Sequence, residues 1–113
     1  MIKLINLTKR NIIAENVIVA KNYWEEAKGL IGAEKAEPML FKTRWGIHTF
    51  GVRFPIDVII FGKDGRVVKI KAGLKPNGLF FWNPKFTNVL ELPEGEIKKS
   101  GLKIGDILKI EQK

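Results

Sequence analysis

Residues 56–72 of this chain are IDVIIFGKDGRVVKIKA, and this stretch decides the fold. Residues 56–61 form the most apolar run of the sequence, and residues 66–72 are rich in valine and isoleucine, as β-strands are. Between them, Gly62-Lys63-Asp64-Gly65 contains an Asp-Gly pair, which supplies the positive φ of a tight hairpin turn. The stretch therefore predicts two antiparallel strands joined by this turn.

Further apolar stretches are short and bounded by turn residues, a pattern that also predicts strands. They are residues 2–7, 12–20, 39–41, 87–92 and 107–110. The first two of these form a predicted hairpin. Short strands at close intervals are typical of mainly β domains. We expect one domain over residues 1–113, a compact β-sandwich or barrel of short, mostly antiparallel strands with one or two short helices.

Two segments predict helix. Asn22 and Glu25 form a capping-box pattern, which predicts a short helix ending at Gly29 or Gly32. Residues 94–100 predict a single helical turn that Gly101 closes.

One segment predicts a loop with many aromatic residues. Residues 73–84 carry glycine and proline on both sides of a Leu-Phe-Phe-Trp run. Phe81 and Trp82 are expected to be exposed in this loop, whereas Phe54 is expected in the core.

The candidate site lies in residues 45–61, which hold the only histidine of the chain, His48. In a straight strand, Arg53 and Asp57 would lie about 13 Å apart, at roughly 3.3 Å per residue. Gly51 and Pro55 mark places where such a strand bends or begins. A bend at either place would bring His48, Arg53 and Asp57 around one concavity.

Asp57 is the most informative residue, because a carboxylate between Ile56 and Val58 is costly to bury unless it is paired or hydrogen-bonded. One interpretation is structural: Asp57 accepts backbone N–H groups of a neighbouring loop, or pairs with Arg53 or a lysine. The other is that Asp57 faces a ligand. The residues alone leave both open.

His48 also has a structural and a functional interpretation. It is chemically able to act in acid–base catalysis, and could hold a metal only with help from Asp57 or Glu91. The single serine, Ser100, lies in a predicted helix end, which argues against a serine–histidine–acid triad. We find no phosphate-binding glycine loop or dinucleotide fingerprint, and we expect neither a metal nor a cofactor.

The predicted ligand-binding residues are His48, Phe50, Arg53, Asp57, Glu91 and Trp82. Three kinds of function remain open on this basis. The first is a small binding module with a pocket or groove around these residues. The second is an enzyme that uses His48 and Asp57 as acid–base groups. The third is a domain that binds nucleic acid or another protein, and the oligomeric state is open as well.

Composition narrows these possibilities. The chain has no cysteine, which excludes disulfides, thiol catalysis and cysteine–zinc sites. It shows no signal-peptide pattern and no apolar run of the length of a membrane helix, so a cytoplasmic location is expected.

The net charge of +8 favours anionic partners, and weak nucleic-acid binding is one expectation. The lysines are dispersed, however, and a lysine- and glutamate-rich chain also fits a heat-adapted protein.

Residues 17–112 resemble the domain of unknown function family 192. The resemblance rests on an ordered set of motifs: Gly29-Leu30, residues 39–41, Pro55 with Asp57, Asp64-Gly65, residues 89–95, and Gly101 with Gly105-Asp106. The resemblance implies a mainly β domain with a small helix. It implies no particular activity, because none is established for the family. Where many relatives have Trp-Met-Lys-Asn-Thr, this chain has His48-Thr49-Phe50-Gly51-Val52, which resembles a second branch of the family.

Overall fold

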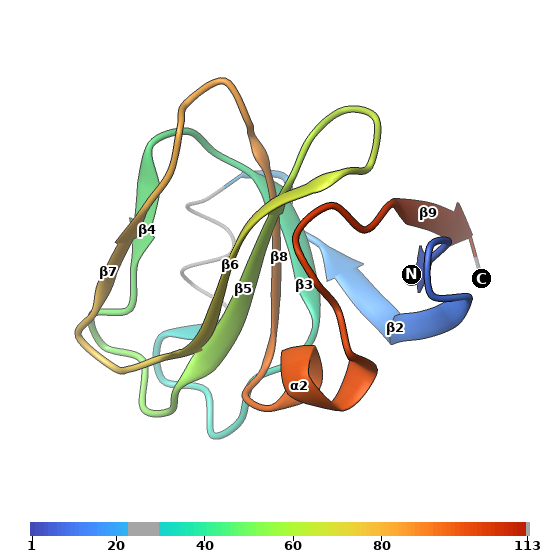
Figure 1. Cartoon of the computed structure of the whole chain (residues 1–113). Coiled ribbons are helices and arrows are strands. Elements are labelled where there is room, and N and C mark those ends of the chain that lie inside the picture. Colours follow the sequence, from blue (N-terminus) through green and yellow to red (C-terminus); the bar gives the residue numbers. More distant parts are fainter. Residues whose placement is uncertain (23–29, 113) are drawn as a thin grey trace.

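The computed structural model describes residues 1–22 and 30–112, and this part of the chain is mainly β (Figure 1). The predicted helix from Asn22 to Gly29 or Gly32 falls largely outside the described residues. The elements are β1 (Ile2–Asn6), β2 (Asn11–Val19), β3 (Met39–Lys42), β4 (Gly46–His48), β5 (Ile56–Phe61), β6 (Val67–Leu74), β7 (Leu79–Phe81), β8 (Asn88–Pro93), α2 (Glu96–Ser100) and β9 (Leu108–Gln112).

Within the described residues, seven strands form one curled sheet in the order β6-β5-β8-β3-β2-β1-β9, and β4 pairs with β7 in a separate small sheet. All pairs are antiparallel except β2 with β3. The two edges of the large sheet meet where Arg66, just before β6, bridges Ile107, just before β9. The sheet is therefore a half-barrel, which confirms the expected fold class.

The predicted hairpin of residues 56–72 is present as β5 and β6. Its turn contains Gly65 at φ +86°, the conformation expected of the Asp-Gly pair. A Cβ on Gly65 would collide with the carbonyl oxygen of Leu108, and the N–H of Leu108 donates to the carbonyl of Gly65. This turn thus also fastens β9 to the opposite edge of the sheet.

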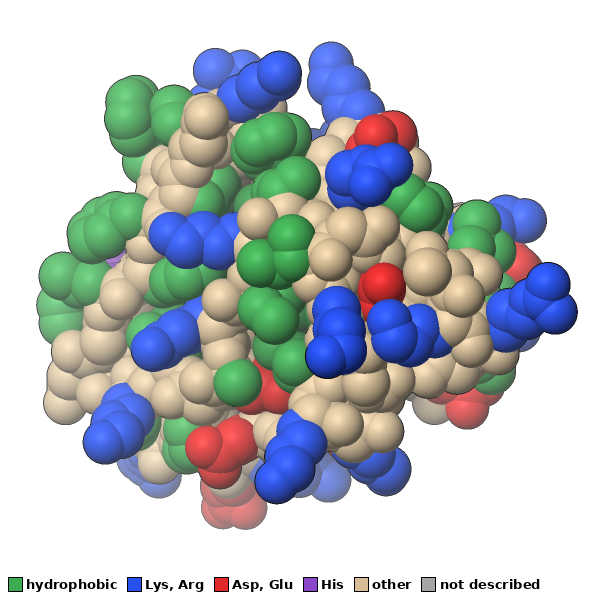
Figure 2. Space-filling model, viewed as in Figure 1, with side chains coloured by type: hydrophobic (Ala, Val, Ile, Leu, Met, Phe, Trp, Pro, Cys, Tyr) green, Lys and Arg blue, Asp and Glu red, His purple; other side chains and the backbone are tan. Residues whose placement is uncertain are grey.

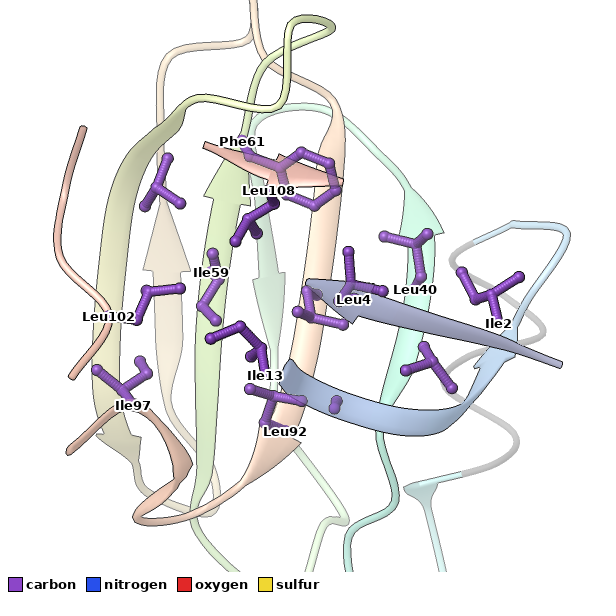
Figure 3. Packing of buried hydrophobic residues seen from close by; sticks show 14 residues of the cluster. Ile2, Leu4, Ile13, Leu40, Ile59, Phe61, Leu92, Ile97, Leu102 and Leu108 are labelled. Carbon is purple, nitrogen blue, oxygen red and sulfur yellow. The ribbon is translucent and has the colours of Figure 1, made fainter. Parts of the chain in front are cut away.

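Every residue of β5 is buried, because each face of the sheet carries its own apolar cluster. The inner cluster fills the half-barrel between the curled sheet and α2, as Figure 3 shows around Leu4, Ile59 and Leu108. The outer cluster lies between the other face of the sheet and the small β4–β7 sheet, which contributes Ile47 and Phe80. The β4–β7 sheet is thus a second layer over the outer face.

The other local predictions have mixed outcomes. The hairpin of β1 and β2, the strands β3, β8 and β9, and the helical turn α2 closed by Gly101 are confirmed. The prediction of a loop over residues 73–84 is wrong in part, because β6 runs on to Leu74 and residues 79–81 form β7. Pairing with β4, which lies more than thirty positions earlier, orders this segment.

Candidate functional site

Asp57 is held inside the half-barrel by backbone N–H groups. Its Oδ1 accepts from the N–H of Gly73 at 2.9 Å, and its Oδ2 accepts from Gly95 at 3.1 Å and Ile97 at 2.9 Å. The first contact comes from an irregularity in the β5–β6 pairing, and the others come from the beginning of α2. Asp57, only 1% exposed, therefore joins β5, β6 and α2.

A second buried carboxylate, Asp106, closes the other side of the half-barrel. It accepts from Asn6 Nδ2 at 2.8 Å, Lys9 Nζ at 2.9 Å and the N–H of Lys103 at 3.0 Å. Burial raises the pKa of Asp106, but these hydrogen bonds and the charge of Lys9 outweigh burial and hold the pKa below its ordinary value. Asp106 is thus an ionised anchor between β1 and the segment before β9.

Two of the predicted site residues, Glu91 and Trp82, are buried on the outer side of the sheet. Glu91 is 2% exposed and pairs with Met39 and Val58, both members of the outer cluster. Trp82 is 6% exposed and donates from Nε1 to the carbonyl of Phe86, so the prediction that Trp82 is exposed is wrong. Both side chains belong to the packing beneath the β4–β7 layer.

The remaining predicted residues, His48, Phe50 and Arg53, do not lie beside Asp57. Asp57 pairs with Leu92 of the inner cluster, so its side chain lies on the inner face of the sheet. His48 and Phe50 belong to the layer that covers the outer face, and Arg53 is exposed after a turn at Gly51. The structure thus brings His48 and Phe50 together and places the sheet between them and Asp57.

His48 and Phe50 stack on each other, with ring centroids 4.9 Å apart and an interplanar angle of 23°. The N–H of Phe50 donates to His48 Nδ1 at 3.2 Å, which fixes the orientation of the imidazole. Cross-strand pairing places Leu79 opposite His48 and Phe81 opposite Gly46. These side chains point away from the outer cluster, because Ile47 and Phe80 alternate with them and point into it.

The outward side of this layer is unusually apolar for a protein surface. Trp45 is 68% exposed, Phe81 59%, Leu79 56% and Phe50 49%. We call Trp45, His48, Phe50, Leu79 and Phe81 the outer aromatic face. Figure 2 shows hydrophobic side chains gathered at the left of the view, over β4 and β7, with the histidine among them.

The backbone of Trp45 is strained. Trp45 has φ +73°, a conformation that costs a residue with a side chain about 1–2 kcal/mol. Its carbonyl accepts from the N–H of Trp82 at 2.9 Å, which ties the start of β4 to the end of β7. A Cβ on the next residue, Gly46, would collide with the ring of Phe81, so the glycine leaves room for that ring beside β4.

Two surface hollows in the described part of the chain lie away from the outer aromatic face. One of about 430 Å³ lies between β2 and α2 and is lined by residues that include Asn11, Glu15 and Lys99. Another of about 480 Å³ is lined by residues that include Lys21, Lys42 and Lys63. Neither of these two hollows is lined by any of the predicted site residues.

A model of the DUF192 family, described as "Uncharacterized ACR", matches residues 5–110. The chain belongs to this family.

Two solved structures share the fold of this DUF192 domain. One is a protein of unknown function from Novosphingobium aromaticivorans DSM 12444, with 24% identity and a TM-score of 0.79 over 96% of this chain and 82% of that chain. The other is a candidate transcription regulator from Sinorhizobium meliloti 1021, with 21% identity and a TM-score of 0.81 over 96% and 91%. At these identities the likeness shows the fold alone. No curated protein matches the sequence.

Two further observations concern the described part of this DUF192 domain. Across residues 1–22 and 30–112, no group of three or more histidine, aspartate or glutamate side chains is placed to hold a metal ion. The same residues contain no helix long and apolar enough to span a membrane.

Sequence reasoning misses part of the outer aromatic face. Trp45, Leu79 and Phe81 are not among the predicted binding residues, although Phe81 is expected to be exposed. The signal that could find Leu79 and Phe81 is the alternation Gly46-x-His48 and Leu79-x-Phe81 around buried Ile47 and Phe80, which is the period of a two-sided strand. This alternation does not predict the exposure of Trp45.

Proposed function

We propose that this DUF192 domain is a small binding module whose ligand lies on the outer aromatic face. The observation that carries the proposal is the exposure of Phe50, Leu79 and Phe81 over a small sheet whose other side is packed, with Trp45 exposed just before β4. Exposed apolar patches of this kind mark interaction surfaces.

Backbone strain supports the same assignment. Residues held in sparsely populated conformations cluster at binding sites, where the surrounding structure holds them in place. Trp45 adopts φ +73°, and its large side chain is 68% exposed, so packing in the core does not explain why a non-glycine residue occupies this position. A ligand that contacts the indole ring would explain it.

Of the predicted binding residues, His48 and Phe50 belong to this surface, and Arg53 is an exposed charge close to it in sequence. Acid–base chemistry that pairs His48 with Asp57 is disfavoured, because the sheet separates them and three backbone N–H groups occupy the carboxylate. Glu91 and Trp82 pack beneath this surface, whereas Asp57 lies on the opposite face of the sheet.

The test is a titration of the ¹⁵N-labelled domain with indole, a neutral aromatic probe, followed by amide chemical shifts. We expect the shifts to concentrate in residues 45–52 and 79–82. Phe81→Ser should weaken the response several-fold, whereas Ile104→Ser, at a residue that is 61% exposed elsewhere, should leave it unchanged. Shifts that concentrate elsewhere, or that Phe81→Ser leaves unaltered, would refute the proposal.

A further inference from the structure

The positive charge of the chain is concentrated in the part that carries the outer aromatic face. Residues 38–90 hold nine lysines and arginines but only two acidic residues, Asp57 and Asp64, and so account for +7 of the net charge of +8. One of these acids, Asp57, is buried and bound by backbone N–H groups. The same residues contain all seven phenylalanines of the chain.

Strand pairing places two of these lysines on the side of the large sheet that β4 and β7 cover. Lys69 pairs with Ile60 and Lys71 with Val58, and both partners belong to the outer cluster. The two lysines therefore lie on the side of the sheet that β4 and β7 cover. Lys69 Nζ donates to the carbonyl of Phe81 at 2.6 Å and lies 5.0 Å from the centre of the Phe80 ring.

The surface view agrees with this distribution. In Figure 2, Lys and Arg side chains lie beside the hydrophobic group over β4 and β7, and the acidic side chains of this view lie lower or farther right. The partner that complements such a surface is an anion with flat, apolar parts. Single-stranded nucleic acid has this chemistry, because aromatic side chains stack on its bases while cations follow its phosphates.

The spacing of the face favours single strands over duplex. Side chains two positions apart on one side of a strand are separated by roughly 6.6 Å, about twice the rise of 3.4 Å between stacked bases. Leu79 and Phe81 have this relation. His48 and Phe50 stack on each other and so form one further platform. Bases that are separated from one another can each meet a side chain there, whereas bases stacked inside a duplex cannot.

We propose that the ligand of the outer aromatic face is single-stranded nucleic acid, which stacks on Phe81 and the His48–Phe50 pair while Lys69 and Lys71 neutralise its phosphates. This inference rests on the proposed binding function and names its ligand class. A second copy of the chain is a poor occupant by comparison, because two domains of charge +8 repel each other.

The test is fluorescence anisotropy with labelled oligothymidylate and oligouridylate of about 12 nucleotides, a length within the usual site size of small single-strand-binding domains. A salt series is measured for each, and the two oligomers distinguish DNA from RNA. The same DNA annealed to its complement and unlabelled inorganic polyphosphate serve as competitors. We expect a steep loss of affinity with salt, and weaker competition from both competitors than from an unlabelled single strand.

Two variants separate stacking from charge. Phe81→Ser should weaken binding about tenfold or more, because the variant removes one stacking platform. Lys71→Glu should weaken binding and reduce the slope of log affinity against log salt by roughly 0.7 for each phosphate that is no longer neutralised. The matched controls are Ile104→Ser and Lys109→Glu, which alter exposed residues outside the face and should have the smaller effects. Circular dichroism of every variant establishes that the fold is retained.

Each alternative outcome overturns the inference. Equal affinity for duplex and single strand, or full competition by polyphosphate, would leave charge alone as the cause of binding. Dimerisation that Phe81→Ser abolishes, without binding to either oligomer, would assign the face to a second copy. If indole binds the face and the oligomers do not, the binding module stands and nucleic acid is excluded; if neither binds, both proposals fail.

Discussion

Inside the half-barrel, two carboxylates are buried and fully engaged, whereas on the outer aromatic face large apolar side chains are exposed. Asp57 and Asp106 are 1% and 5% exposed, while Trp45 and Phe81 are 68% and 59% exposed. Each region thus inverts the usual distribution of polar and apolar groups, and such inversions are the informative positions in a structure. The buried carboxylates join distant elements of the fold, and the exposed aromatics are the residues to which we assign ligand binding.

The largest loss of stability is expected from a substitution of Asp57, inside the half-barrel. Asp57→Ala should lower the free energy of unfolding by about 3–4 kcal/mol, because the buried N–H donors of Gly73, Gly95 and Ile97 lose their acceptor. Chemical denaturation measures this loss.

The control for this change is Asp64→Ala, which removes an acceptor in the exposed turn and should cost less than about 1 kcal/mol. Equal costs at Asp57 and Asp64 would mean that the buried carboxylate does not hold the fold together.

The next effect concerns the closure of the half-barrel. Gly65→Ala should destabilise the protein by about 2–4 kcal/mol, because a left-handed backbone is strained with a side chain and the new Cβ meets the carbonyl of Leu108. Gly105→Ala shares the positive φ but meets nothing within 4 Å, so it should cost only about 1–2 kcal/mol. Thermal unfolding compares the two, and identical losses would show that the contact with β9 contributes nothing.

Asp106 predicts a dependence of stability on pH. Its pKa is lower in the folded protein than in the unfolded chain, so its contribution is present above the unfolded pKa of about 3.9 and is lost as pH falls through the folded pKa. Asp106→Asn should therefore be less stable than the wild type at pH 7 and lose less stability below about pH 4. Urea unfolding at several pH values measures both slopes; parallel curves below that pH would contradict the assignment.

The smallest effect on the free energy of unfolding is expected at Trp45, on the outer aromatic face. Trp45→Gly relieves a strained backbone but adds the flexibility of glycine to the unfolded chain, so the free energy of unfolding should stay the same or rise by up to about 1 kcal/mol. Binding of indole to the outer aromatic face should fall in the same variant. A large loss of stability would instead show that Trp45 is a packing residue, and the contrast between the two regions would disappear.

The fold is predictable where its signals are local. The Asp-Gly turn, the apolar run of β5 and the glycine after α2 each act over a few residues, and all three are present as expected. The partners of Asp57 are not predictable, because they lie 16 to 40 positions away along the chain. The sequence shows that the buried carboxylate of Asp57 needs hydrogen-bond donors, but it does not show which residues supply them.

The candidate site is predictable only in part for the same reason. His48 and Phe50 stand two positions apart and stack, so local sequence reasoning finds them together. Leu79 and Phe81 join them only through the pairing of two three-residue strands that are separated by more than thirty positions. Both Phe81 and Trp82 are predicted to be exposed. The alternation of β7 directs neighbouring side chains to opposite sides, so Phe81 is exposed and Trp82 is buried.

The pairing of β1 with β9 has a consequence for how the protein is made. Asn6 and Asp106 are separated by 100 positions, yet they share a hydrogen bond between β1 and the segment before β9. During synthesis, β1 therefore leaves the ribosome long before its partner exists, with one edge unpaired and able to pair with other chains. Contacts so distant in sequence also slow folding. The β5–β6 hairpin can form early, but the β1–β9 pair must wait for the residues around Asp106, so a nascent chain that still lacks these residues is the species most in need of protection from aggregation.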